Sequence, residues 1–266
     1  MVQKKFNVLL HTKISNYNKE IIVDPDKSIS IRSFLIGSIC NKVSTVKNVL
    51  ESEDVFSTIN CLKRLGVKIK KVGTKQYHIS GNGLGSLTIK KNKELNFGNS
   101  GTLARLLIGI LSTTPNIEIK MRGDHSLNKR SMKKLLQLMT KFGAIFLPKN
   151  KFNFPLKLIS SNLPVQINYT SGISAQLKSA VILAGLNAFG TTNIIEKEKS
   201  RNHTENMLKK NKLAIKTIRK KNIIRVIGKK NLEPINISVP GDPSSAAFFS
   251  ALTLLNPNSK ICSIPN

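Results

Sequence analysis

The chain has 266 residues, with 43 Lys or Arg against 14 Asp or Glu, which gives a formal net charge of +29. Hydrophobic residues make up 40% of the sequence, enough for a substantial core, and the length suits one large domain or two ordinary ones. No apolar run approaches the roughly 20 residues of a membrane-spanning helix, and no signal-peptide pattern is present. These features favour a water-soluble protein with no membrane partner.

The positive charge favours an anionic partner, such as nucleic acid or a phosphorylated small molecule. The lysines are scattered along the chain, however, and aromatic residues are only 5% of it, so a stacking platform for nucleic acid is not expected. A nucleic-acid-binding role therefore stays a secondary hypothesis, which a salt-dependent gel shift would test. The three cysteines form no CxxC pair and the four histidines lack metal-ligand spacing, which predicts a cytoplasmic protein without a bound metal.

The first part of the chain predicts alternating strands and helices. In chain order, we expect strands at 6–10 and 20–23, a helix beginning near residue 27, a strand at 43–49, a helix over 52–66, and strands at 67–72 and 76–80. The same order then recurs twice. The second copy has a helix at 98–111, a strand at 117–121, a helix over 132–143, and strands at 144–147 and 156–159. The third has a helix beginning at 174, a strand at 192–196, a helix at 203–212, and strands at 214–218 and 223–227.

A fourth copy begins at residues 240–244 and reaches a helix at 246–255. The helix starts near Lys27, Ser100, Ser174 and Ser244 give a period of about 70–75 residues, which predicts a βαβαββ unit and an α/β (α+β) fold. We expect three complete units to close one lobe over residues 22–236. The ends, residues 1–21 and 237–266, would then form a fragment of a second lobe whose remainder lies outside the sequence.

One stretch, residues 96–105, combines a glycine-rich turn with a helix start. The apolar residues after it recur at i, i+3, i+4 and i+7, which predicts an amphipathic helix with one buried face. A helix start offers unpaired N–H groups and the positive end of a dipole, so it can hold an anion, and Arg105 could add a forked donor. A purely structural turn explains the stretch equally well.

Six motifs in order carry a family resemblance. They are DKSISIRS (26–33), GNSGT (98–102) with Arg105, GDHSL (123–127) with KRSM (129–132), SAQLKSA (174–180) with LAGL (183–186), SRNHTE (200–205) and VPGDPSSA (239–246). Together they resemble the enolpyruvyl-transferase superfamily, and within it the 5-enolpyruvylshikimate-3-phosphate (EPSP) synthase family. The resemblance implies two lobes of three βαβαββ units each, of the inside-out α/β barrel type, that close on substrate between them.

The resemblance also implies a reaction. The enolpyruvyl group of phosphoenolpyruvate is transferred to the 5-hydroxyl of shikimate 3-phosphate, through a tetrahedral ketal that loses phosphate, with no metal or organic cofactor, in a protein that we expect to be monomeric. Matched motif by motif, the residues implied for phosphoenolpyruvate are Lys27, Gly101, Arg130 and Gln176. Those implied for shikimate 3-phosphate are Lys27, Ser28, Arg32, Ser174, Ala175, Gln176 and Arg201. Lys27 is the implied catalytic proton carrier.

The sequence departs from the family pattern in three ways. Pro25 stands where glycine is usual, and Ile31 stands where histidine is usual. The second lobe's acidic and basic site residues have no counterpart, so we expect the chain alone to be inactive. A related alternative, the UDP-N-acetylglucosamine enolpyruvyl transferases, is disfavoured because residues 122–125 contain no cysteine where their reactive cysteine would fall.

Overall fold

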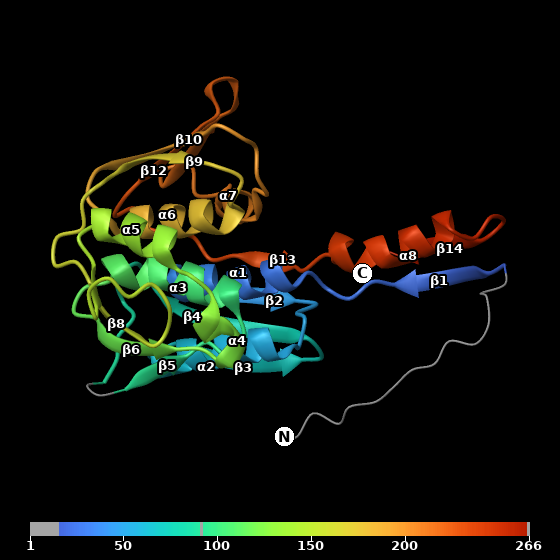
Figure 1. Ribbon diagram of the computed structural model, residues 1–266, viewed down its shortest axis with the longest axis horizontal. Helices are drawn as coiled ribbons and strands as arrows, with labels where there is room; N and C mark the ends of the chain where they lie inside the picture. Colours follow the sequence, from blue (N-terminus) through green and yellow to red (C-terminus); the bar gives the residue numbers. More distant parts are fainter. Residues whose placement is uncertain (1–15, 91–92, 265–266) are drawn as a thin grey trace. The chain divides into compact units, whose positions relative to one another are not determined.

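The computed structural model describes residues 16–90 and 93–264, so the predicted strand at 6–10 lies outside the described residues. The chain forms two compact units (Figure 1). The larger unit is Asp26–Val239, and the smaller is formed by Met1–Pro25 with Pro240–Asn266. No described helix combines the length and the apolar character needed to span a bilayer.

The larger unit contains three four-stranded sheets with the same pattern of parallel and antiparallel pairs. Their strand orders are β13(Asn236–Ser238)-β2(Asn41–Lys47)-β4(Gln76–Asn82)-β3(Lys68–Gly73), β5(Glu94–Asn96)-β6(Glu118–Arg122)-β8(Leu156–Ile159)-β7(Ile145–Leu147), and β9(Asn168–Ser171)-β10(Thr191–Glu196)-β12(Ile223–Ile227)-β11(Ile215–Ile218). In each sheet the first pair is parallel and the next two pairs are antiparallel. This common pattern is the predicted repeat, seen here as structure.

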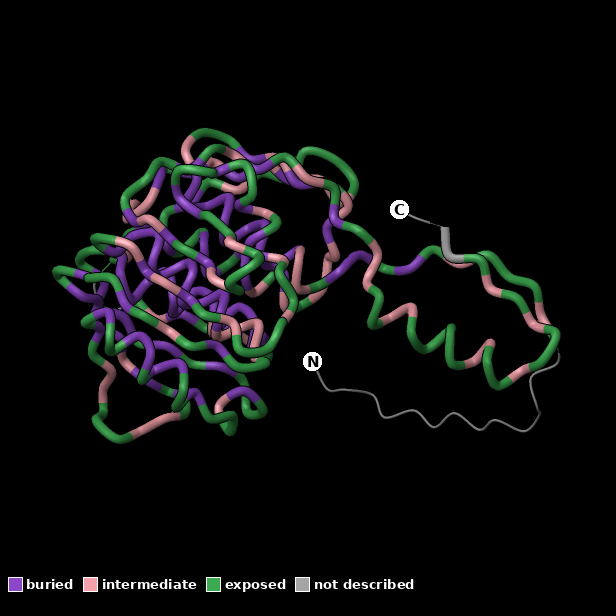
Figure 2. The backbone as a smooth tube through the Cα atoms, turned by 90° about the horizontal axis from the view of Figure 1, so that it is seen from above, coloured by how far each residue is buried: buried purple, intermediate pink, exposed green. Residues whose placement is uncertain are grey.

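Three helices form the centre of the larger unit: α1 (Lys27–Ile39), α3 (Gly101–Thr113) and α6 (Ala175–Asn187). Figure 2 shows that buried residues gather in the interior of the larger unit. The prediction of a one-faced amphipathic helix at 98–111 is wrong, because every residue of α3 except Arg105 is buried. The apolar sequence continues around the helix, and α6 packs so closely that a Cβ on Gly109 would lie 2.6 Å from the carbonyl oxygen of Ala180.

Each central helix begins at a side-chain cap. Asp26, Ser100 and Ser174 accept a hydrogen bond from the backbone N–H three residues ahead, which satisfies one donor of the first turn. The remaining helices of the larger unit are α2 (Glu53–Arg64), α4 (His125–Lys129), α5 (Lys133–Lys141), α7 (His203–Leu208) and a 3₁₀ turn, η1 (Arg219–Lys221). Helix α7 is shorter than the predicted 203–212, because the chain turns after Leu208.

Two strands exchange partners between the ends of the chain. Strand β1 (Asn18–Ile22) precedes α1 in sequence but pairs in parallel with β14 (Lys260–Ile264), in the smaller unit. Strand β13 precedes α8 (Pro243–Leu254) but pairs in parallel with β2, in the larger unit. Residues 237–239 therefore lie within the larger unit, whereas the boundary placed after residue 236 from sequence assigns them to the second-lobe fragment.

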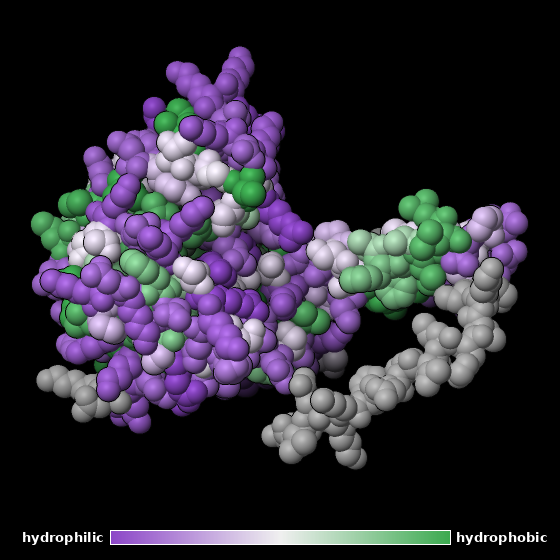
Figure 3. Space-filling view, in the orientation of Figure 1, coloured by the Kyte–Doolittle hydropathy of each residue, from purple (hydrophilic) through white to green (hydrophobic). Residues whose placement is uncertain are grey.

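Helix α8 differs from the three central helices in its exposure. It is as apolar as they are, yet none of its residues is buried. Phe248 is 80% exposed, and Leu254, its last residue, is 85% exposed. Figure 3 shows the hydrophobic surface that this helix presents. An apolar patch of this kind normally marks a surface that packs against something else.

Candidate active site

The N-terminal turns of α3 and α6 are joined by side chains. The amide Nε2 of Gln176 donates to the hydroxyl of Thr102 at 2.9 Å, across the two helix starts. Gln176 and Ala175 are partly exposed, so this junction is accessible from outside. Because each helix start carries unpaired N–H groups and the positive end of a dipole, the junction is suited to binding anions.

Two guanidinium groups meet at the start of α3. Arg105 donates through Nη1 to the carbonyl oxygen of Gly101 at 3.1 Å, and Arg130 donates through Nη2 to Asn99 at 3.0 Å. A Cβ placed on Gly101 would lie 2.6 Å from Arg105 Nη1 and 3.4 Å from Arg130 Nη1, so both groups lie against this glycine. Burial lowers the pKa of Arg105, and the nearby charge of Arg130 lowers it further. An anion between the two would relieve this repulsion.

Lys27 is the first residue of α1, and its side chain is about half exposed. Its Nζ lies 3.1 Å from Oδ2 of Asp54, in the first turn of α2. No role in the site is predicted for Asp54 from sequence. The structure adds that this carboxylate holds the ammonium group of Lys27 in place.

Arg32 is almost completely buried and ties three helices together. Its Nε donates to Thr204 of α7 at 3.1 Å, its Nη1 to the carbonyl oxygen of Ser28 at 3.1 Å, and its Nη2 to Ser179 of α6 at 3.3 Å. These bonds use three of its five N–H donors. Burial lowers the pKa of Arg32, and the carboxylates of Asp26 and Glu205 oppose that shift.

Comparison with known proteins shows the family of the chain. The family model of EPSP synthase (3-phosphoshikimate 1-carboxyvinyltransferase) matches residues 11–263. The chain belongs to the EPSP synthase family. The resemblance inferred from the six motifs is thereby confirmed, and so is the α/β fold.

Individual relatives agree with the family match. The chain is 40% identical over 245 residues to the 3-phosphoshikimate 1-carboxyvinyltransferase of Parvibaculum lavamentivorans, covering 91% of this chain and 54% of the relative. It is 40% identical over 251 residues to that of Bacillus subtilis, covering 94% and 57%. The solved EPSP synthase of Acinetobacter baumannii superposes with a TM-score of 0.81 at 34% identity, covering 92% of this chain and 55% of that one. The chain thus spans about half the length of the curated relatives it matches.

A buried ion cluster holds the SRNHTE motif (200–205) against α6. Lys178 of α6 is fully buried, and its Nζ lies 2.7 Å from Oε1 of Glu196 and 2.7 Å from Oε1 of Glu205. The same Nζ lies 3.4 Å from the carbonyl oxygen of Ser200. The segment that carries Arg201, an exposed residue, is therefore anchored to α6 on both sides.

The structure groups the residues implied for the site in two places. Gly101, Arg130 and Gln176 gather at the starts of α3 and α6. Arg32 connects α1 to α6 and α7, and within α1 it donates to the carbonyl oxygen of Ser28. Ser174 caps α6 through its hydroxyl.

The residues that sequence reasoning gave no role are Asp54, Asn99, Thr102, Ser179, Ser200 and Thr204. All but Asp54 lie inside the recognised motifs. Thr102 and Thr204 are polar side chains in the first turns of α3 and α7, which was the signal available, but the contacts that give all six residues a role depend on packing.

Proposed function

We propose that this chain supplies one substrate-binding lobe for the transfer of an enolpyruvyl group from phosphoenolpyruvate to the 5-hydroxyl of shikimate 3-phosphate. The observation that carries the proposal is the pair of guanidinium groups, Arg105 and Arg130, packed against the start of α3 beside the Gln176–Thr102 bond. Phosphoenolpyruvate carries a phosphate and a carboxylate, and guanidinium groups bind both in bidentate fashion.

The two substrates are assigned to neighbouring helix starts. Phosphoenolpyruvate lies at the start of α3, against Gly101, Arg105 and Arg130. Shikimate 3-phosphate lies at the start of α6, where the residues proposed to bind it are Ser174, Ala175, Gln176 and Arg201, together with Lys27, Ser28 and Arg32 of α1. Gln176 reaches both sites, because its amide is bonded to Thr102 of α3 while its backbone belongs to α6.

The reaction needs charge stabilisation and one mobile proton. A C–O bond forms between the 5-oxygen of shikimate 3-phosphate and C2 of phosphoenolpyruvate as the 5-hydroxyl loses its proton and C3 gains one. The C2–O bond to phosphate then breaks, and C3 gives a proton back. Lys27 is proposed to carry this proton, held by Asp54, and the fixed helix starts and guanidinium groups stabilise the developing charge without rearranging.

Turnover is proposed to require more than these 266 residues. The matched relatives are nearly twice as long, since the chain covers 54% and 57% of two of them. Helix α8 supports the same view, because it is exposed while α1, α3 and α6 are buried. In a coupled phosphate-release assay the isolated chain should show no turnover, and normal turnover would contradict this part of the proposal.

Substrate binding is tested by calorimetry with a matched pair of variants. Arg130→Ala should weaken phosphoenolpyruvate binding by roughly ten- to a hundredfold, since a charge-assisted hydrogen bond is worth about 1.5–3 kcal/mol. Arg122→Ala is the control, because Arg122 is also an exposed arginine and is paired with Glu94 at 2.8 Å. Equal losses in both variants, or no binding of either substrate at millimolar concentration, would contradict the assignment.

The setting of the protein completes the proposal. We propose a monomeric, cytoplasmic protein, which is supported by the three free cysteines, two of them buried. Sedimentation velocity of the purified chain tests the monomer. A stable dimer at micromolar concentration would contradict it.

A further inference from the structure

A cavity apart from the proposed substrate site lies in the third repeat. It is lined by residues of α7, β11, η1 and the end of β10. Its volume is about 710 Å³, which is within the range of small-molecule sites. Five exposed cationic side chains line it: Lys199, Lys209, Lys212, Lys216 and Arg219. None of them was assigned to the site for enolpyruvyl transfer.

The charge of this cavity exceeds what one phosphate group would balance. Glu196 and Glu205 are the carboxylates among its lining residues, and Lys178 lies 2.7 Å from both and partly neutralises them. The five cations therefore remain in clear excess. A single phosphate carries a charge of about −1.5 to −2 at neutral pH, so several phosphates match the cavity better.

Two lining residues also hold polar atoms that lack a hydrogen-bond partner. Oε2 of Glu205 and Oγ of Ser200 are buried and unbonded, and Glu205 is only 8% exposed. Leaving a buried polar atom unpaired costs free energy, which a ligand with a suitable donor would recover. The carboxylate oxygen can only accept, so that donor must be a hydroxyl or amino group.

We propose that this cavity binds a small oligophosphate that also carries hydroxyl or amino groups, the chemistry of a nucleoside di- or triphosphate. Its phosphates lie among the lysines and Arg219, and its hydroxyl or amino groups donate to Glu205 and Ser200. The proposal does not depend on the enolpyruvyl-transfer function, because it uses a different cavity and different cations.

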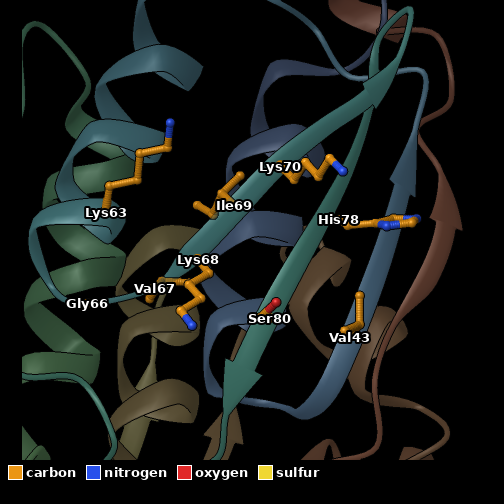
Figure 4. Close-up of a pocket in the computed structure, with 9 residues that line it drawn as sticks. All are labelled: Val43, Lys63, Gly66, Val67, Lys68, Ile69, Lys70, His78 and Ser80. Carbon is orange, nitrogen blue, oxygen red and sulfur yellow. The ribbon is translucent and has the colours of Figure 1, made fainter.

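The first repeat offers an internal control. A groove of about 560 Å³ is lined by Lys63 of α2, Lys68 and Lys70 of β3, and His78 of β4 (Figure 4). It is also cationic. Among the described residues, however, none that lines it holds a buried side-chain nitrogen or oxygen without a partner. Non-specific attraction of anions would act on both surfaces, whereas the proposed ligand should bind only at the cavity.

The test is calorimetric titration of the full chain with ATP, in physiological salt and without divalent cations. We expect one site, and binding about tenfold weaker in the double variant Lys209→Ala/Lys216→Ala, as expected when charge-assisted contacts to phosphate are lost. The double variant Lys63→Ala/Lys68→Ala should bind like the wild type. All four lysines are exposed, so both variants should fold, and circular dichroism checks this.

A second comparison isolates the hydroxyl and amino groups. ATP should bind more tightly than inorganic tripolyphosphate, and Ser200→Ala should weaken ATP binding while leaving tripolyphosphate unchanged. Equal affinity for the two probes, equal losses in the two double variants, or no saturable binding would each overturn the proposal. Stoichiometric displacement of ATP by shikimate 3-phosphate would also overturn it, since the cavity would then belong to the substrate site.

Discussion

Replacing Lys178 by methionine is expected to destabilise the larger unit by about 3–5 kcal/mol, near the top of that range. Methionine keeps most of the length and apolar volume of the side chain but removes Nζ. That atom lies 2.7 Å from each of two carboxylates, Glu196 and Glu205, whose side chains are only 14% and 8% exposed. The variant therefore leaves two desolvated negative charges without their cation, whereas breaking an ordinary buried ion pair leaves one.

The assay is urea unfolding of wild type and variant, followed by far-UV circular dichroism. Lys71→Met is the matched control, because Nζ of Lys71 lies 2.6 Å from Oε1 of Glu51 but the lysine is half exposed. An exposed pair of this kind contributes about 0.2–1 kcal/mol. Similar losses in the two variants would refute the argument from burial. Adding Glu205→Gln to Lys178→Met should recover part of the lost stability, since one of the unpaired charges is then removed.

Three further predictions follow from local geometry. Gly101→Ala should displace the Arg105 guanidinium, 2.6 Å from the new Cβ, and weaken phosphoenolpyruvate binding about tenfold while sparing shikimate 3-phosphate; equal loss for both ligands in calorimetry would contradict it. The hydrogen bond from Lys71 lowers the pKa of Glu51 below its usual 4.5. The ionised Glu51 therefore stabilises the folded state fully above pH 4.5, and this contribution is lost as the pH falls through the lowered pKa. Glu51→Gln should therefore flatten the loss of stability in acid, as measured by urea titrations at stepped pH. Burial raises the pKa of the Cys40 and Cys61 thiols to about 12. Cys262 is exposed, so it alone of the three cysteines should react rapidly with Ellman's reagent before denaturation.

The sequence alone determined where the central helices begin and how the units repeat. Asp26, Ser100 and Ser174 cap α1, α3 and α6 as their positions before apolar runs predict, because a cap is a hydrogen bond between residues three apart. The motifs were sufficient to indicate the family, since they are short local patterns in a fixed order. Caps and short motifs of this kind can be recognised without knowledge of the fold.

Four strands and the pairing of distant strands were beyond the sequence. Strands β5, β9, β13 and β14, of three to five residues each, were not predicted, although β7 and β8, which are as short, were. The exchange that pairs β1 with β14 and β13 with β2 joins opposite ends of the chain. Pairing over such separations depends on how whole elements pack.

The same limit applies to the site. The glycine-rich turn at 96–105 was correctly predicted to precede a helix, but two guanidinium groups meet there only because Arg105 and Arg130, 25 residues apart in sequence, fold onto one glycine. The bond from Gln176 to Thr102 and the ion cluster around Lys178 likewise depend on which helices touch. Sequence determined the helix starts, because their hydrogen bonds are local. Tertiary structure decided which starts face one another, because that follows from the packing of α3 against α6.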